Sequence, residues 1–368
     1  MFSTILIYKN QLMKIVSYLT EPASYTIDLI SKVHIPLKID YRFLQKKTSA
    51  KTQDLLNESL YMNDNNWLKR IAIIKKDYKT YDVIIFNGYD RLDFIFLMFI
   101  HLFSFNKKNI GLESDTQLGI PHNFLKRIIK KLYLNFIFSD KYFHGLAGGN
   151  DSHRKLFSYY GMREENIHFL PMVIDVEKRN FKTDRSRNSI FTFLFVGRFI
   201  PLKQIELIIK SFLIAFDDSS KVQLKLVGDG PLLKELQAKY KCHNIDFKGA
   251  LFDDNLLNEY KDSHALILGS NREQWGLVIN EALACGLAVL SNDKVGANFD
   301  LIEGKNTGYI FNSKKEFDLS VKMKSIFEDQ SYFNKCCVNG HDLMHKYWNF
   351  NLYSEKLFEA AKKMMSND

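Results

Sequence analysis

The stretch that decides the fold is "IFTFLFVGRFIPLKQIELIIKSFLIAF", residues 190–216. Its first seven residues are almost entirely apolar or aromatic, which is typical of a strand that is buried on both faces. A glycine and an arginine follow, and from Leu202 the apolar residues recur at helical spacing. A buried strand that leads at once into a helix is the repeating unit of a parallel α/β sheet.

The same alternation continues toward the C-terminus. Further strands are predicted at "VQLKLVG" (222–228), "NIDFKG" (244–249), "HALILG" (264–269) and "LAVLS" (287–291), with helical patterns between them. One of these helices is "PLLKELQAKY", with Pro231 in its first turn. The sequence therefore predicts a Rossmann-like domain over residues 190–346.

The first half of the chain shows a second series of this kind. Strands are predicted at 14–19, 81–86 and 109–112, and helices at 92–104, 122–138 and 151–160. A chain of 368 residues is too long for one ordinary core. We therefore expect an α/β protein with two Rossmann-like domains that face each other across a cleft. The expected parts are a first domain over 1–176 (with 1–12 as an extension), a polar linker over 177–189, the second domain over 190–346 and a closing helix over 347–368.

The amino-acid composition limits the kinds of molecule that the protein is expected to bind, but it does not identify one. The net charge of +9 favours phosphates, an anionic membrane or nucleic acid. We find no nucleic-acid-binding module and no Lys/Arg block, so nucleic acid is not expected. The four cysteines lack C-x-x-C spacing, which favours a reducing compartment over a disulfide framework or zinc site. The longest apolar run, 94–105, is shorter than the roughly 20 residues that a membrane-spanning helix needs. The expected location is the cytoplasm.

Candidate site residues cluster in "GSNREQWGLVINEALACGLAVLSNDKVGA", residues 269–297. Ligands of open α/β sheets bind at the carboxyl ends of the strands, and a helix begins here near Gly276. The unpaired N–H groups of its first turn favour a phosphate. Glu273 and Glu281 would repel a phosphate, so we assign them to sugar hydroxyls on either side of it. The alternative is a helix-terminal charge at Glu273 and a surface carboxylate at Glu281.

Two turns that precede this stretch, in the second half of the chain, contain further candidate site residues, which are cations and glycines. Arg198 and Lys203 follow the strand at 190–197 and could clamp a diphosphate, or they could be ordinary surface cations. The segment "VGDGP" (227–231) is either a turn that lines a nucleotide site or a tight βα turn and no more. Neither a G-x-G-x-x-G fingerprint nor a P-loop is present.

Five segments in this order carry a resemblance to a known family: "VGR" with Lys203, "VGDGP", "FKGAL" (247–251), the E-x7-E segment "EQWGLVINEALACGLAVLS" (273–291) and "VGANFDLIEGKNTGYIF" (295–311). Together they resemble the donor-binding domain of family 4 glycosyltransferases, of the group 1 type and the GT-B fold. The resemblance implies retaining transfer of a hexosyl or N-acetylhexosaminyl group from a nucleotide-sugar. The implied acceptor is a glycan or lipid-linked saccharide in cell-surface polysaccharide biosynthesis, and no metal or other cofactor is implied.

The resemblance also implies roles for particular residues. Arg198 and Lys203 would hold the diphosphate and stabilise the departing nucleotide, Glu273 would bind the donor sugar, and Glu281 would bind the ribose. The backbone that cradles phosphate would be Gly276, Leu277 and Val278, next to the strand end at Gly197. The turns around the base would be Gly228, Asp229, Gly230, Lys248, Gly249 and Ala250.

This chain departs from the family pattern at several positions. Gln274 and Ala288 stand where prolines are frequent, and "YLTEPASY" lacks the glycines that often follow the first strand. The family often has a histidine at an N-domain strand end, where this chain has "NIGLESDTQ". Glu113 or Asp115 is therefore a candidate to replace that histidine or to orient the acceptor hydroxyl. The alternative is a capped loop in which "SDT" enters a helix.

The segment "NFLKRIIKKLYLNFIF" (123–138) predicts a basic amphipathic helix. Its cations are Lys126, Arg127, Lys130 and Lys131, and its apolar side is Leu125, Ile128, Ile129 and Leu132. Such a helix suits the anionic inner face of a membrane. The alternative is an ordinary surface helix whose apolar side packs on the sheet.

Two other functions stay open at this point. One is a nucleotide-sugar epimerase on the same fold, and the other is a non-catalytic subunit of a glycan-assembly complex. His341 and His345 have the spacing of a metal pair, but they lack the glutamate of H-E-x-x-H and are expected to be packing or surface residues.

Overall fold

The computed structural model describes residues 7–8, 11–22, 24–33, 38–45, 61–62, 66–149, 151–181, 190–217 and 219–366. The chain divides into two compact units. Unit 1 comprises Met1–Met172 and Phe350–Asp368, and unit 2 comprises Val173–Asn349. Most of the predicted extension 1–12 and of the predicted linker 177–189 lies outside the described residues.

Unit 1 contains a six-stranded parallel sheet in the order β4-β3-β5-β6-β7-β8. The strands are β3 (Lys14–Leu19), β4 (Lys38–Phe43), β5 (Val83–Asn87), β6 (Asn109–Ser114), β7 (Phe143–Ala147) and β8 (Ile167–Phe169). The helices are α1 (Ser24–Lys32), α2 (Trp67–Thr80), α3 (Leu92–Leu102), α4 (Phe124–Phe138), α5 (Asp151–Tyr159) and α13 (Phe350–Ser366). A two-residue antiparallel pair, β1 (Ile7–Tyr8) and β2 (Gln11–Leu12), precedes the sheet.

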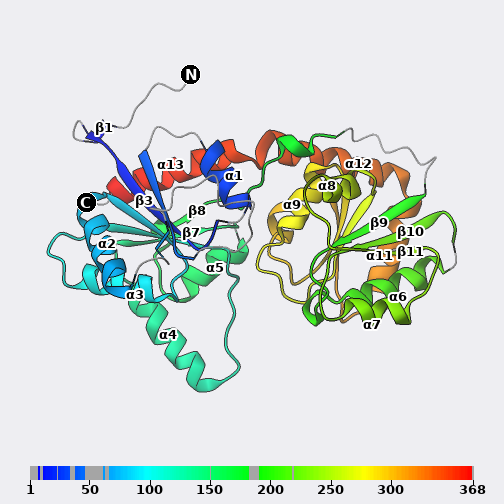
Figure 1. The fold of residues 1–368 in the computed structure, drawn as a ribbon, viewed down its shortest axis with the longest axis horizontal. Coiled ribbons are helices and arrows are strands. Elements are labelled where there is room, and N and C mark those ends of the chain that lie inside the picture. The colour runs from blue at the N-terminus through cyan, green and yellow to red at the C-terminus, as the bar shows by residue number, and fades with distance from the viewer. Residues whose placement is uncertain are drawn as a thin grey trace. The chain divides into compact units, whose positions relative to one another are not determined.

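Helices cover both faces of the unit 1 sheet (Figure 1). The central strand β5 is nearly all apolar because both of its faces are buried, whereas β6 is also mostly buried but contains polar residues. The last helix, α13, closes this unit: Tyr353, Leu357 and Met364 are buried, and Met364 packs against Gly111 of β6, where an added Cβ would lie 3.2 Å from its methyl carbon.

Unit 2 repeats the architecture with a six-stranded parallel sheet in the order β11-β10-β9-β12-β13-β14. The strands are β9 (Phe191–Val196), β10 (Val222–Val227), β11 (Ile245–Gly249), β12 (Ala265–Leu268), β13 (Ala288–Asn292) and β14 (Gly308–Phe311). The helices are α6 (Ile205–Phe216), α7 (Leu233–Lys239), α8 (Asp253–Lys261), α9 (Leu277–Ala284), α10 (Asn298–Leu301), α11 (Asp318–Glu328) and α12 (Gln330–Asp342). The prediction of two Rossmann-like domains is confirmed.

Two local predictions are wrong. Pro231 does not lie in the first turn of α7, which begins at Leu233, because Pro231 and Leu232 form the turn that precedes it. The segment "SDT" (114–116) does not enter a helix, since the chain is irregular from Asp115 until α4 begins at Phe124.

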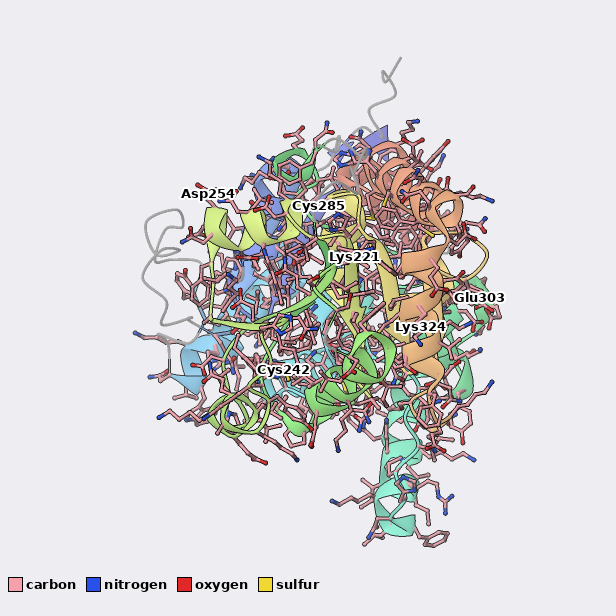
Figure 2. All side chains as sticks on the ribbon, turned by 90° about the vertical axis from the view of Figure 1, so that its right-hand side faces the viewer. Lys221, Cys242, Asp254, Cys285, Glu303 and Lys324 are labelled. Carbon is pink, nitrogen blue, oxygen red and sulfur yellow. The ribbon has the colours of Figure 1, made fainter. Side chains whose placement is uncertain are left out.

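The cysteines and the paired histidines of unit 2 are structural. All four cysteines are free thiols, and Cys242 and Cys285 lie in different parts of the unit (Figure 2). His341 contacts Asn180 through its Nε2, and His345 contacts the Ala284 carbonyl, with the two imidazole rings stacked at 4.0 Å. Among the residues that the structure describes, no helix has the length and apolar character needed to cross a membrane.

A buried histidine pair makes unit 1 sensitive to acid. His144 and His168 stack, with Nδ1 of one 3.1 Å from Nε2 of the other. Burial lowers the pKa of His144 to about 3, with His168 adding to the effect. Burial also lowers the pKa of His168 to about 4, with smaller contributions from Lys363 and Arg154. Both rings are therefore neutral in the folded protein at neutral pH.

We expect the free energy of unfolding to be constant above about pH 6.5 and to fall below it. The unfolded rings bind protons near their ordinary pKa of about 6.5, whereas the folded rings do not, so acid favours unfolding. The loss is about 2 kcal/mol for each ring between about pH 7 and about pH 5. Urea titrations across this range measure it. His168→Gln should flatten the pH dependence and His122→Gln, at an exposed position, should not.

Candidate active site

The candidate site of unit 2 lies at the carboxyl ends of its parallel strands. From β9 the chain proceeds outward to β10 and β11, and then returns to place β12, β13 and β14 on the other side of β9. The strand order therefore reverses between β9 and β12, and this is where open α/β sheets bind ligands. The segments that follow β9 and β12 contain Lys203 and Glu273.

Three glycine-containing turns form a continuous row along this edge. The N–H of Gly197 donates to the Val227 carbonyl at 3.0 Å, and the N–H of Phe199 donates to the Asp229 carbonyl at 2.8 Å. The N–H of Gly228 donates to the Gly249 carbonyl at 2.8 Å. The turns after β9, β10 and β11 thus lie side by side, as the resemblance requires of segments that bind one ligand.

The closeness of these turns explains the glycine at position 228. Gly228 has φ +139°, and a Cβ there would lie 1.8 Å from the Gly197 carbonyl oxygen. Only glycine combines this conformation with this approach. Asp229 stabilises the same turn, because its carboxylate accepts a hydrogen bond from the N–H of Gly230 at 2.6 Å.

Lys203 and Glu273 are in direct contact although 70 residues separate them. The Lys203 ammonium donates to Oε2 of Glu273, and the Ser270 hydroxyl donates to the same oxygen at 2.9 Å. A backbone hydrogen bond of 3.0 Å from Asn271 to the Leu202 carbonyl fixes the two loops together. Both side chains remain partly exposed at the strand ends, Lys203 at 15% and Glu273 at 23%.

The loop that carries Glu273 is anchored on both sides. The N–H of Glu273 donates to the Lys294 carbonyl at 3.2 Å, and the Glu273 carbonyl accepts from the N–H of Gly296 at 3.1 Å. Trp275 is buried, donates through Nε1 to Asn280 at 2.8 Å and stacks on Trp348. A tryptophan two positions after the glutamate therefore fixes the loop, and no proline is needed at Gln274.

Gly276 begins α9 beside Glu273. It has φ +104°, and an added Cβ would lie 3.4 Å from Cγ of Glu273. Leu277 and Val278 form the first helical turn, where N–H groups have no partner within the helix. The Glu273 carboxylate and the positive N-terminal end of the α9 dipole thus lie next to each other at the carboxyl edge of the sheet.

Glu281 is held by two residues that the sequence analysis did not identify. Arg179 donates to its Oε1 at 2.9 Å, and the Tyr260 hydroxyl donates to its Oε2 at 2.8 Å. Burial, followed by the charge and hydrogen bond of Glu281, raises the pKa of Tyr260 well above its ordinary value. Arg179 lies in the segment that was interpreted as a polar linker, so its type and position gave no signal of this contact.

The remaining predicted residues of unit 2 are more exposed. Arg198 and Ala250 are exposed. Lys248 pairs with Asp246 at 2.7 Å, which raises the pKa of the lysine, and lies 4.0 Å from Glu259. The structure therefore brings Lys203 and Glu273 together and pairs Glu281 with Arg179, while Arg198 is exposed.

In unit 1, Glu113 lies at the corresponding edge, near the end of β6. It is in register with Asn87 of β5, whose side-chain oxygen accepts a hydrogen bond of 2.8 Å from Thr20. Burial raises the pKa of Glu113 to about 7, the hydrogen bond from Asn87 opposes this shift, and the charge of Asp115 adds to it. Asn87 and Thr20 were not predicted, because neither belongs to a motif.

On α4, Lys126, Arg127 and Lys131 are exposed, and Lys130 donates to the Gly119 carbonyl at 2.8 Å. The alternative in which Leu125, Ile128, Ile129 and Leu132 pack on the sheet is wrong, since all four are exposed. The helix is instead attached through Leu134, Ile137 and Phe138, which are buried.

Comparison with known proteins assigns the class. Residues 176–341 match the family model described as glycosyl transferases group 1. Sulfoquinovosyl transferase SQD2 of Arabidopsis thaliana is 30% identical over 141 residues, which are 37% of this chain and 26% of that protein. The uncharacterized glycosyltransferase MJ1178 of Methanocaldococcus jannaschii is 24% identical over 67% of this chain and 69% of that protein.

The structural comparison agrees with the sequence comparison. HepE of Anabaena, solved in complex with UDP, superposes with a TM-score of 0.75 over 96% of this chain and 100% of that chain, at 15% identity. Residues 176–341 thus resemble the glycosyl transferases group 1 family, and the chain has the GT-B fold. These matches support a glycosyltransferase.

Proposed function

We propose that this glycosyltransferase moves a sugar from a nucleotide-sugar donor to a glycan or lipid-linked saccharide, with retention of anomeric configuration, in cytoplasmic steps of cell-surface polysaccharide assembly. The observation that carries the proposal is the contact between Lys203 and Glu273 at the point where the strand order of unit 2 reverses. A cation for a diphosphate and an anion for sugar hydroxyls adjoin there.

In the proposed reaction the nucleotide diphosphate leaves with a growing negative charge. Lys203, and Arg198 in the same segment after β9, supply positive charge for it, and the first turn of α9 supplies N–H donors. A carboxylate offers about four lone-pair sites, so Glu273 can accept hydrogen bonds from the donor sugar while it is paired with Lys203.

Glu281 is proposed to bind the ribose hydroxyls of the donor nucleotide. Arg179 and Tyr260 take one carboxylate oxygen each, which fixes the side chain in one orientation. A carboxylate fixed in this way loses less conformational entropy when it accepts hydroxyl groups than a mobile one does. Arg179 and Tyr260 are therefore positioning residues in this proposal.

The test is a thermal-shift screen of the full chain against UDP-, GDP-, ADP- and CDP-sugars, followed by turnover of the donor that stabilises. Binding of the true donor raises Tm with its concentration. Glu273→Gln should abolish turnover without changing Tm in the absence of donor. Full activity of that variant would remove the proposal, an epimerised donor would indicate an epimerase, and binding without turnover with any acceptor extract would indicate a binding subunit.

We expect turnover to be independent of divalent metal. Lys203 and Arg198 supply the charge that a metal ion supplies at other diphosphate sites. Rates measured with excess EDTA should equal those measured with Mg²⁺ or Mn²⁺. A loss of more than about tenfold in EDTA, reversed by one of these ions, would contradict the assignment of that charge to the two cations.

On the acceptor side, Glu113 is proposed to orient the acceptor hydroxyl as a carboxylate. Because its pKa is raised to about 7, the transfer rate should rise as pH increases through this value. Glu113→Gln should lower the rate and remove the inflection. Asp115→Asn should move the inflection to lower pH, since the Asp115 charge raises the pKa of Glu113.

Donor affinity is the control for the acceptor-side assignment. Glu113 lies in unit 1 and the donor residues lie in unit 2, so the thermal shift with donor should be the same in both variants. An unchanged pH–rate profile in Glu113→Gln would show that another group titrates.

We further propose that the cations of α4 (Lys126, Arg127, Lys130 and Lys131) face an anionic membrane, where a lipid-linked acceptor resides. Their clustering on one exposed helix without an acidic residue supports this.

A further inference from the structure

The end of α3 leaves large apolar side chains in solvent. Phe103 is 83% exposed and Phe105 is fully exposed, and Phe99 and Leu102 are also exposed. The start of the same apolar run is buried, since Phe94 and Leu97 are inaccessible. Single exposed apolar residues are common on soluble proteins, but a contiguous group marks an interaction surface.

One face of α4 is apolar and exposed as well. Leu125, Ile129, Leu132 and Phe136 follow each other at intervals of four, three and four residues, so they share a face of the helix. Each is more than half exposed, from 56% at Phe136 to 67% at Leu132. Both views show α4 projecting from unit 1 (Figures 1 and 2).

These two groups adjoin. Leu102 and Met98 of α3 line a hollow together with Phe136 and Ile137 of α4. His101 of α3 lies 3.4 Å from the carboxylate of Asp140, just beyond the end of α4. We call the exposed apolar residues of 99–105 and 125–136 the α3–α4 surface.

The charged residues within the segments that form the α3–α4 surface are of one sign. Segments 94–108 and 116–138 contain no acidic residue, and their cations are Lys107, Lys108, Lys126, Arg127, Lys130 and Lys131. An apolar ridge flanked by these cations matches the boundary of an anionic bilayer, and the one carboxylate that lines the hollow, Asp140, contacts His101. Apolar side chains enter the acyl region there, and cations meet the lipid phosphates.

We propose that the α3–α4 surface is a docking site for an anionic lipid leaflet, into which Phe103, Phe105 and the apolar face of α4 insert. The inference extends the membrane contact of the proposed function from the cations of one helix to an apolar surface made by two. The surface would attach the enzyme to the membrane in two ways, by insertion of apolar side chains and by attraction between charges. Peripheral proteins need about two such contributions for stable binding.

The experiment is co-sedimentation of the full chain with vesicles of phosphatidylcholine alone or mixed with phosphatidylglycerol. We expect binding to the anionic vesicles that weakens with salt. Phe103→Ser/Phe105→Ser should reduce partitioning by about tenfold or more. Lys126→Gln/Lys131→Gln should reduce it by roughly thirtyfold and lower its salt dependence.

Matched controls come from unit 2. Ile214→Ser/Val321→Ser changes two apolar residues that are just over half exposed, on α6 and α11. Lys221→Gln/Lys324→Gln removes the same charge at two exposed lysines, both labelled in Figure 2. The apolar control should bind vesicles as the parent does. The charge control should bind them with a partition coefficient within a few-fold of that of the parent.

Two results would overturn the proposal. One is equal vesicle binding by the parent and the Phe103→Ser/Phe105→Ser variant. The other is a dimer in gel filtration that this variant dissociates, together with no vesicle binding, which would make the surface an interface between two copies. Donor turnover is measured without vesicles, so an enzyme that binds lipid but turns over no donor would instead remove the proposed function.

Discussion

Replacing Lys203 with alanine is expected to lower kcat by about three orders of magnitude and to leave the fold intact. The substitution removes the cation nearest to the proposed diphosphate site. It also leaves the Glu273 carboxylate with the Ser270 hydroxyl but without the ammonium. The measurement is the rate of nucleotide release at saturating donor, together with Tm in the absence of donor.

Lys210 provides the matched control for this prediction. It belongs to α6 in the same unit, is exposed and pairs with Glu206 at 3.3 Å, so Lys210→Ala removes an ion pair away from the strand ends. Its kcat should stay within about twofold of the parent, because exposed ion pairs contribute little. If Lys203→Ala also retained the parent kcat, the strand-end cation would have no part in the reaction.

A double substitution distinguishes joint action from separate roles. Lys203 and Glu273 touch, so their effects on the transition state should not add. We expect the variant with both Lys203→Ala and Glu273→Gln to be no slower than the slower single variant by more than about tenfold. Strict multiplication of the two losses would mean that the two side chains act independently of each other.

The second large effect is expected at Gly228. A Cβ at this position would lie 1.8 Å from the carbonyl oxygen of Gly197, and φ is +139°. Backbone cannot move aside cheaply, so Gly228→Ala should destabilise unit 2 by several kcal/mol and displace the turns that form the donor edge. Urea unfolding and the thermal shift with donor measure the two consequences.

Gly249 is the control for conformational strain alone. It also has positive φ, at +70°, but an added Cβ there meets no atom within 4 Å. Gly249→Ala should therefore cost only about 1 kcal/mol, which is the penalty of a left-handed conformation. Equal destabilisation by the two substitutions would show that the contact with Gly197 is relieved by a small shift of the chain.

The sequence predicted strands best where burial on both faces makes a continuous apolar run. β9 and β12 are such runs and were located within a residue or two. β4, with the sequence "KIDYRF", lies at the edge of its sheet and is mostly half-buried, so its pattern is mixed. β7, "FHGLA", is fully buried but contains a histidine and a glycine, and only its tertiary neighbours make it a strand.

The same reasoning explains what could be foreseen of the site. Lys203 and Glu273 follow strands of one parallel sheet, and parallel strands end at a common edge, so their proximity could be inferred from position. The partner of Glu281 could not be inferred in this way. Arg179 is 102 residues away, in a short 3-10 helix (Glu177–Arg179) that precedes the first strand of unit 2 and carries no sequence motif.

The helix α4 shows what a pattern leaves undecided. Its spacing correctly predicted a helix with one apolar and one cationic side. The spacing of apolar residues predicts which face of a helix is apolar, but it does not predict what packs against that face. The interpretation of Leu125 and Leu132 as residues that pack on the sheet is therefore wrong for a helix that is attached only near its end.

The return of α13 to unit 1 has a consequence for the order of assembly during synthesis. Unit 2 is one uninterrupted segment, Val173–Asn349, and its sheet can be completed as soon as that segment has left the ribosome. Unit 1 lacks Tyr353, Leu357 and Met364 until all of unit 2 has been translated. The half that begins first is therefore completed last, and its unfinished face needs protection from aggregation while the nascent chain grows.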